Sequence, residues 1–351
     1  MVLSAVVSGT LAVGALGGAP AANATCLSAF GIGNGGGCTS NLTSVAIGVG
    51  SGAQSNAGTG LFSSAISFGT SAISATTFSM LSFAVAYGDE ARASTLPSVL
   101  SVAFQMGPGS SSVLGALNFA IGILNEAAGK QSTSVAGLGG LGIQFGPGTM
   151  TNMGSLNLTL ASTSGGTGTK ATKAAGLGNL AVNIGNAGTA WTQGFLSSAT
   201  NIMGASSVFT QGILTAAGNI MGTGNVLSST GSFPNTALSL AFNFFGDNNT
   251  VSAGTGPFAV AGTILQNLRT IKQFGPGIDI NGPISAAASV VSSKKASPPA
   301  ASGGSNATTP AAVASSGSNK NASNSSSSKS STKKSNGSAS SGAGRTKRNK
   351  N

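Results

Sequence analysis

The stretch "SFAVAYGDEARAS" (residues 82–94) places a large side chain at every second position, reaches a glycine and continues into a short polar run. The large residues are Phe83, Val85 and Tyr87, with alanine between them. A period of two is typical of a β-strand with one buried face. We therefore expect a strand that buries its large side chains and ends in a turn at Gly88.

The same pattern recurs from "TSVAIGVGSGAQSNAG" at residue 43 to "LSLAFNFFGDNNTVSAG" at residue 238. We expect the large residues to pack together in one narrow core and the small or polar residues between them to face outward. The further large residues are Val45, Ile47, Leu100, Val102, Phe104, Leu141, Ile143, Phe145, Leu180, Val182, Ile184, Leu238, Leu240, Phe242 and Phe244. The residues that alternate with them are Ala46, Ala84, Ala86, Ala103, Gln144, Ala181, Asn183, Ala241 and Asn243.

Glycines follow these segments at a regular spacing. We expect them to form the corners of successive coils, since glycine adopts a positive φ at almost no cost. The corner glycines are Gly48, Gly69, Gly88, Gly107, Gly146, Gly185, Gly204, Gly222 and Gly246. A repeat of ~20 residues over most of a chain is typical of a solenoid. The predicted fold is mainly β, a parallel β-solenoid or β-roll over residues 43–282. The "GPG" triplets at 107–109, 146–148 and 275–277 are expected at such corners.

The charges behind Gly88 have two interpretations. Asp89, Glu90 and Arg92 either occupy a solvated coil corner, or Asp89 and Glu90 form a catalytic pair that acts with a further residue in a pocket. Polar runs recur at this place in other repeats, which favours the corner. The chain contains no histidine, which excludes a Ser-His-Asp or Cys-His hydrolase. A carbohydrate-active enzyme that uses Asp89 and Glu90, or Asp247, stays as a minor alternative, because glycoside hydrolysis needs two suitably spaced carboxylates. We expect no cofactor and no metal.

The N-terminal residues 1–24 resemble a secretory signal peptide that ends in Ala22-Asn23-Ala24, although no basic residue precedes the apolar part. The chain has two cysteines, Cys26 and Cys38. In an exported protein they are expected to form a disulfide that closes a Gly-rich loop over residues 25–42; two free thiols are the alternative.

The composition changes near the C-terminus. Residues 1–290 hold six basic and five acidic residues, a net charge of +1, whereas the remainder holds the other ten of the 16 basic residues and no acid. The last part, residues 283–351, is rich in Ser, Asn and Lys and is expected to be a disordered tail.

We expect this tail to bind anionic cell-wall or host polysaccharide, or an acidic lipid surface, by electrostatic attraction. Sequence-specific nucleic-acid binding is not expected, because the tail has no aromatic residue that could stack on bases. A purely solubilising tail is the alternative. The basic residues assigned to this role are Lys294, Lys295, Lys333, Lys334, Arg345, Lys347, Arg348 and Lys350.

Two resemblances accompany these patterns. "TSVAIGVGSGAQSNAG" and "SFAVAYGDEARAS" resemble the head repeats of trimeric autotransporter adhesins, which implies a left-handed parallel β-roll and a role in surface adhesion. The Gly/Ala/Asn-rich body and residues 246–282 resemble repeat-rich exported proteins of mycobacteria, which implies a secreted or cell-envelope location.

Neither resemblance supplies a catalytic residue, and the sequence reveals no defined biochemical activity. We predict an exported, non-enzymatic structural or adhesion protein of the cell envelope, and we leave a homo-oligomer open. A membrane-inserted barrel or pore is the alternative function.

Overall fold

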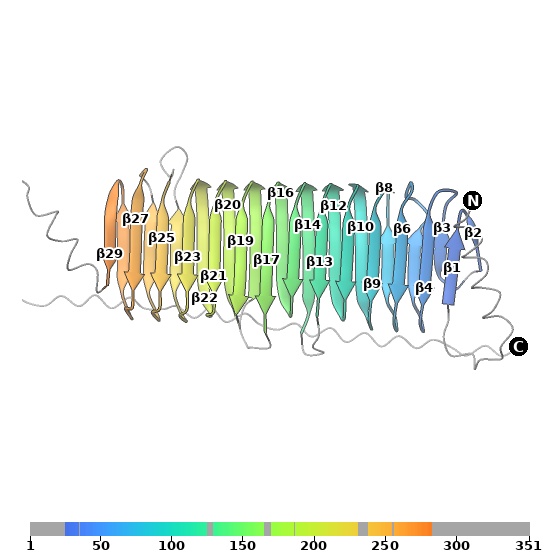
Figure 1. Cartoon of the computed structure of the whole chain (residues 1–351), viewed down its shortest axis with the longest axis horizontal. Coiled ribbons are helices and arrows are strands. Elements are labelled where there is room, and N and C mark those ends of the chain that lie inside the picture. Colours follow the sequence, from blue (N-terminus) through green and yellow to red (C-terminus); the bar gives the residue numbers. More distant parts are fainter. Residues whose placement is uncertain are drawn as a thin grey trace, which may run out of the picture. The chain divides into compact units, whose positions relative to one another are not determined.

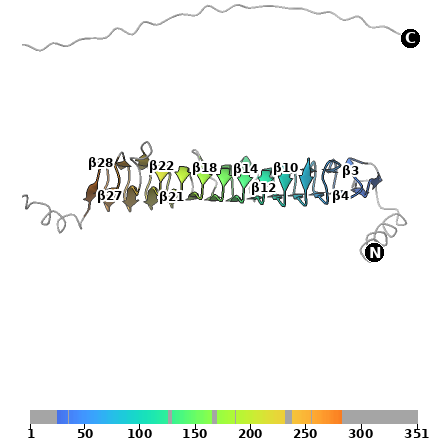
Figure 2. The same ribbon diagram turned by 90° about the horizontal axis from the view of Figure 1, so that it is seen from above.

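The computed structural model describes residues 25–34, 36–124, 129–164, 170–185, 187–230, 238–254 and 256–282. The predicted signal peptide and the predicted tail lie outside this part of the chain. Every regular element in the described part is a β-strand, and the strands form two stacked layers (Figures 1 and 2). Within the same residues there is no helix that could cross a membrane.

The first layer, sheet A, contains fifteen strands. In spatial order these are β2 (Ile32–Gly33), β1 (Thr25–Ala29), β4 (Val45–Val49), β6 (Ser64–Phe68), β9 (Phe83–Tyr87), β11 (Val102–Met106), β13 (Phe119–Ile123), β15 (Leu141–Phe145), β17 (Leu158–Thr163), β19 (Leu180–Gly185), β21 (Ser198–Ile202), β23 (Ala216–Ile220), β25 (Leu240–Phe244), β27 (Ala259–Ile264) and β29 (Gly277–Asn281).

The second layer, sheet B, contains fourteen strands. They are β3 (Cys38–Ser40), β5 (Gln54–Ala57), β7 (Ile73–Thr76), β8 (Ser79–Met80), β10 (Ala91–Val99), β12 (Gly109–Ala116), β14 (Gln131–Leu138), β16 (Gly148–Ser155), β18 (Lys170–Leu177), β20 (Gly188–Phe195), β22 (Ser206–Ile213), β24 (Val226–Thr230), β26 (Thr250–Gly254) and β28 (Thr270–Phe274).

From β3 onward the chain alternates between the two sheets, apart from β7 and β8, which both lie in sheet B, so each coil adds a strand to each layer. Strands of consecutive coils pair in parallel; Val102 of β11, for example, is paired with Phe83 of β9 and Phe119 of β13. This is the predicted parallel β-solenoid, and it includes strands throughout residues 178–227. Coil length varies. For example, the coil that leads from Val102 to Phe119 is shorter than the coil that leads from Ala216 to Leu240.

The N-terminal segment is part of the solenoid and is not a separate loop as predicted for residues 25–42. Strand β1 runs antiparallel to both β4 and β2, whereas β3 pairs in parallel with β5. The predicted disulfide, Cys26–Cys38, joins β1 of sheet A to β3 of sheet B. It therefore connects the two layers at the first coil.

The predicted orientation of the strands is wrong. The small and polar residues fill the interior: Ala46, Ala84, Ala86, Ala103, Ala181, Asn183, Ala241 and Asn243 are 0 % exposed, and Gln144 is 1 % exposed. The large residues face outward, and Phe83, Tyr87 and Phe145 are 47, 54 and 43 % exposed. The period of two is correct, but the buried face is the opposite one.

The reason lies in the architecture of the coil. Each coil is two short strands joined by two tight turns, so the interior holds only the inward side chains of two facing strands. In one interior cluster seven of the nine buried residues are alanines, contributed by both sheets: Ala72, Ala84, Ala86, Ala91, Ala93, Ala103, Val113, Ala120 and Val135. Bulky residues from both strands would overfill this space, and overpacking destabilises a core.

One corner of the coil differs from the expected glycine turn. Leucine occupies it in most coils, in the left-handed conformation: Leu81, Leu100, Leu117, Leu156, Leu196, Leu214 and Leu238 have φ between 51° and 60°. Leu100 and Leu238, predicted as buried strand residues, are thus exposed turn residues. This conformation costs a residue with a Cβ about 1 kcal/mol or more. Hydrogen bonds to the preceding coil hold it, as in Leu100 N–H to Met80 O (2.9 Å).

Buried amides stack along the interior. In sheet A the Nδ2 of Asn201 donates to Oδ1 of Asn183 (2.9 Å), and the Nδ2 of Asn219 donates to Oδ1 of Asn201 (2.9 Å). Asn243 continues this asparagine ladder by donating to Asn219 (2.8 Å). Each amide thereby satisfies its neighbour, which is the condition for burying polar groups without a large cost.

The asparagine ladder yields a stability prediction. The Asn201→Ala variant leaves Oδ1 of Asn183 without its donor and the Asn219 amide without one acceptor, so it should lower the free energy of unfolding by about 2–4 kcal/mol. Thr200→Ala, the neighbouring position on the outward face, should change it by less than about 0.5 kcal/mol. Urea unfolding followed by circular dichroism measures both, and equal effects would contradict a structural role for the ladder.

Candidate functional site

The outward face of sheet A is a continuous apolar surface. From β4 to β19 its side chains form three ladders that cross the strands, and only Ser64 and Ser162 interrupt them. We call these residues the apolar face: Val45, Phe83, Val102, Phe119, Leu141, Leu158 and Leu180; Ile47, Ile66, Val85, Phe104, Ile121, Ile143, Leu160 and Val182; Val49, Phe68, Tyr87, Met106, Ile123, Phe145 and Ile184.

The outward side chains become smaller on the next two strands, β21 and β23. Several outward residues are small here, among them Ala216 and Gly218, and a Cβ added to Gly218 would meet no atom within 4 Å. Large side chains return on β25, where the rings of Phe242 and Phe244 lie 5.1 Å apart. Among the described strands of sheet A the only charged residue is Asp279, in β29 at the C-terminal end.

The outward face of sheet B is mixed, with exposed apolar residues such as Leu114, Leu138 and Phe195 toward the C-terminal ends of its strands. Its central positions are mostly serine and threonine, as in the register Ser94–Ser112–Ser134–Thr151. All six basic residues of the described part lie in a sheet B strand or directly before one: Arg92, Lys130, Lys170, Lys173, Arg269 and Lys272. No strand of sheet B in the described part carries an acidic residue. The solenoid therefore has one apolar, nearly uncharged face and one mixed, cationic face.

The two aspartates considered for catalysis bind the backbone of the preceding coil. Asp89 Oδ1 accepts a hydrogen bond from Thr70 N–H (2.8 Å), and Asp247 Oδ1 accepts one from Thr223 N–H (2.7 Å). The bond from Thr70 lowers the pKa of the fully exposed Asp89 carboxyl below its ordinary value. Both carboxylates lie at turns, Asp89 between β9 and β10 and Asp247 between β25 and β26, and this arrangement supports their interpretation as corner residues.

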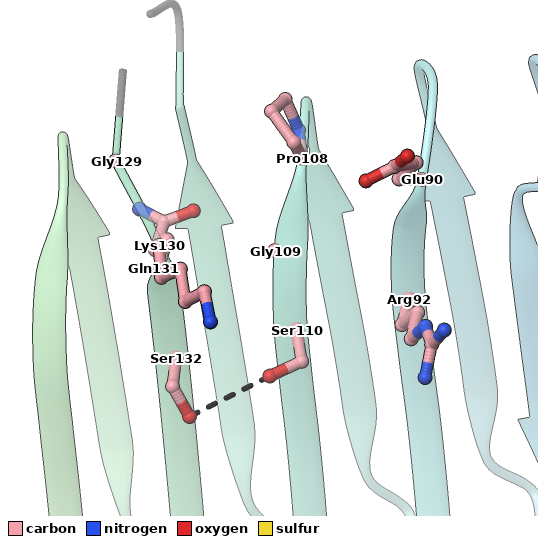
Figure 3. Close-up of a pocket in the computed structure, with 9 residues that line it drawn as sticks. All are labelled: Glu90, Arg92, Pro108, Gly109, Ser110, Gly129, Lys130, Gln131 and Ser132. Atoms are coloured by element: carbon pink, nitrogen blue, oxygen red, sulfur yellow. Dashed lines mark hydrogen bonds between the residues drawn. The ribbon is translucent and has the colours of Figure 1, made fainter. Parts of the chain in front are cut away.

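A cleft of about 880 Å³ lies at the same edge of sheet B. Figure 3 shows Glu90 and Pro108 at the turns above it and Arg92 farther along its strand. Ser110 and Ser132 of neighbouring coils are joined across it by a hydrogen bond of 3.5 Å. The cleft brings a carboxylate and two basic residues, Arg92 and Lys130, to one edge, but no second carboxylate of the described residues lines it.

Eight of the nine predicted corner glycines fall into three groups. Gly69, Gly88, Gly107 and Gly146 lie at bends and have φ between 79°, at Gly107, and 126°, at Gly69. Gly185 ends β19, with a φ of 150°. Gly204, Gly222 and Gly246 lie at turns but have no positive φ; instead, the next coil comes so close that a Cβ on Gly222 would lie 2.0 Å from the carbonyl oxygen of Gly246.

Gly48 is not a corner residue, and its assignment was wrong. It lies within β4 and points into the first coil, where a Cβ would come within 2.6 Å of Cys26 Sγ and 3.3 Å of Cys38 Sγ. The turn of this coil is made by Gly50, with a φ of 125°. Gly48 thus leaves room for the disulfide.

The remaining predicted sites divide between described and undescribed residues. The basic residues of the tail all lie outside the described residues. No group of three or more His, Cys, Asp or Glu that could hold a metal ion occurs among the residues that the structure describes.

Searches against family models, curated proteins and solved structures found no match to this chain.

The apolar face is the feature that the sequence interpretation missed. Its residues were identified, but they were assigned to the interior. One signal in the sequence indicates the correct orientation, namely the asparagines at alternate positions of successive repeats, such as Asn183 and Asn243. In the structure they are buried and bond to asparagines of neighbouring coils.

The glycine corners yield a matched pair of variants. Gly222→Ala should lower the free energy of unfolding by about 2–3 kcal/mol, because the new methyl group collides with the backbone of the next coil. Gly218→Ala, in the adjacent strand, should be neutral or stabilising by up to about 1 kcal/mol, because its methyl group enters open space. Thermal unfolding of both variants decides the point, and similar losses would show that close approach is not what requires Gly222.

Proposed function

We propose that the protein is an exported, non-enzymatic structural or adhesion protein of the cell envelope, and that it acts through the apolar face. The observation that carries this proposal is the outward orientation of the large side chains on sheet A. The disulfide between Cys26 and Cys38 supports an oxidising location outside the cytoplasm. The resemblance to exported repeat proteins points to the same location.

The size of the apolar face argues for a permanent contact. The apolar face covers eight strands, β4 to β19, spaced ~4.8 Å apart with about five residues each at ~3.3 Å, which is roughly 38 Å by 16 Å, on the order of 600 Å². The largest apolar patch of an ordinary monomer is about 300–600 Å². A stable protein interface buries about 800 Å² on each partner. The apolar face is therefore at the upper end of the range for a monomer, and Phe242 and Phe244 of β25, together with the exposed leucines of the neighbouring corner, extend the apolar surface toward the size of a stable interface.

We propose that the occupant of the apolar face is a second copy of the same chain. Two sheets can pack face to face at about 10 Å with their side chains interdigitated. Two copies bring few like charges together, since Asp279 at the end is the one charge on the described strands of this sheet. The exposed Leu81, Leu100 and Leu117 at the neighbouring corner extend the contact.

A lysine in the centre of the apolar face tests this pairing. Ile143→Lys places a charge in the middle of the interface and should weaken self-association by about 30-fold or more. Ser134→Lys, on the outward face of the opposite sheet, should leave it unchanged. Sedimentation equilibrium of the wild type and both variants gives the dissociation constants.

A wild-type chain that stays monomeric at micromolar concentration would contradict the pairing. If such a chain instead binds to neutral lipid vesicles through Ile143, the occupant is a lipid surface and not a second copy. Equal weakening by the two lysine variants would show that the apolar face is not the contact.

We further propose that the basic tail attaches the solenoid to anionic polymers. The ten basic residues after residue 290, among them Arg345, Lys347 and Arg348, are not accompanied by an acid. Attraction between such a segment and a polyanion is long-ranged and is screened by salt.

Truncation tests the role of the tail. Deletion of the residues after 290 should abolish binding to immobilised polyanion at low salt, and binding of the full chain should weaken steeply between about 50 and 500 mM salt, as the Debye length shortens. Salt-independent binding, or undiminished binding by the truncated chain, would contradict an electrostatic tail.

A further inference from the structure

The outward face of sheet B contains an aromatic cluster around Trp191. Trp191, the only tryptophan of the chain, lies in β20 and is 42 % exposed. In the next coil the ring of Phe209 meets it edge to face, with centroids 4.9 Å apart. In the preceding coil the Nζ of Lys173 lies 5.7 Å from the centre of the indole. A cation and a second ring therefore flank the indole from the coils on either side.

A shallow apolar groove surrounds this cluster. Its volume is about 500 Å³, and its lining includes Trp191, Phe209 and Val226. Three hydroxyl groups, of Thr189, Ser207 and Ser228, also line it. The groove is thus an apolar platform with hydroxyl groups and one cation around it, on a face whose central positions are mostly serine and threonine.

The register of sheet B places this platform within a longer row. Thr151 and Lys173 precede Trp191 in the same outward column, and Ser228 and Ser252 follow Phe209. Neighbouring positions in the column are separated by the strand spacing, ~4.8 Å, which is close to the length of one sugar unit in an extended polysaccharide. No acidic residue occurs on the described strands of sheet B, so nothing on these strands repels an anion.

We propose that Trp191, Phe209 and Lys173 form a binding subsite for an acidic saccharide. The sugar stacks its C–H face on the exposed part of the indole, its hydroxyl groups bond to Ser207 and Ser228, and its carboxylate pairs with the ammonium group of Lys173. A ligand with both an apolar face and a hydroxyl rim matches the groove, whereas an acyl chain could form no hydrogen bond with Thr189, with Ser207 or with Ser228, whose hydroxyl group also bonds to Ser252 (3.0 Å). This site lies on the face opposite the apolar face and does not depend on self-association.

The single tryptophan makes the site directly observable. Addition of trigalacturonic acid to the full-length protein should change the emission of Trp191 in a saturable manner. The trisaccharide spans about three coils at ~4.8 Å each, so it contacts the groove without reaching the ends of the sheet. Maltotriose, a neutral trisaccharide, should bind at least about threefold more weakly, because it lacks the contact with Lys173.

Two lysines of the same outward column provide the variant and its control. Lys173→Gln should weaken trigalacturonate binding by about three- to fivefold, the size of one exposed ion pair. Lys272→Gln, five strands away in the same sheet, should leave it unchanged. The positively charged tail is identical in the two variants, so any contribution from it cancels.

Calorimetry measures the contribution of the rings. Trp191→Ala should lower the affinity by about tenfold, whereas Trp191→Phe should retain most of it, because a phenyl ring still offers a stacking surface. Circular dichroism and thermal unfolding of each variant show whether the solenoid is intact; Trp191→Phe serves as the test if Trp191→Ala is not folded.

Several results would overturn the subsite. One is an emission spectrum that trigalacturonate leaves unchanged up to millimolar concentration. Another is an equal loss of affinity in Lys173→Gln and Lys272→Gln, which would mean non-specific attraction. Equal affinity for maltotriose would remove the acidic specificity, and a response to anionic phospholipid vesicles but not to the saccharide would assign the groove to a lipid surface.

Discussion

The narrow space between the two sheets is the constraint on which the rest of the structure depends. Each coil contributes a few inward side chains from each strand, and alanines such as Ala84 and Ala103 are completely buried there. A core of this kind gains little from burial of large apolar groups and more from close packing and from hydrogen bonds between coils. The asparagine ladder and the stacked strands supply those bonds from one coil to the next.

The same constraint sends the large side chains outward and so produces the two faces. Sheet A carries large apolar residues on most of its strands, whereas sheet B combines serine, threonine and the basic residues with exposed apolar residues such as Leu138 and Phe195. An exposed apolar surface of this extent favours association. The packing of the narrow interior and the self-association that we propose therefore both follow from a single choice of strand orientation.

The turns show how the coils stay in register despite their unequal length. Glycine occurs where the backbone of the next coil leaves no room for a Cβ, as at Gly222. At the opposite corner leucine adopts a left-handed conformation that is held by hydrogen bonds to the coil before it. A local preference against this conformation is overcome because every coil imposes the same path on the next.

The sequence by itself determined the strand period, the short repeat, the parallel solenoid, the disulfide and the positive-φ corners at triplets such as 107–109. These features follow from local rules of backbone conformation, spacing and redox chemistry. Only the tertiary structure decided which face of each strand is buried. A period of two is unchanged when inside and outside are exchanged, and the exchange depends on the distance between two sheets that no single strand encodes. For the same reason the clusters around Trp191 and on the apolar face, whose members come from successive coils and are remote in the sequence, became visible only when the coils were stacked.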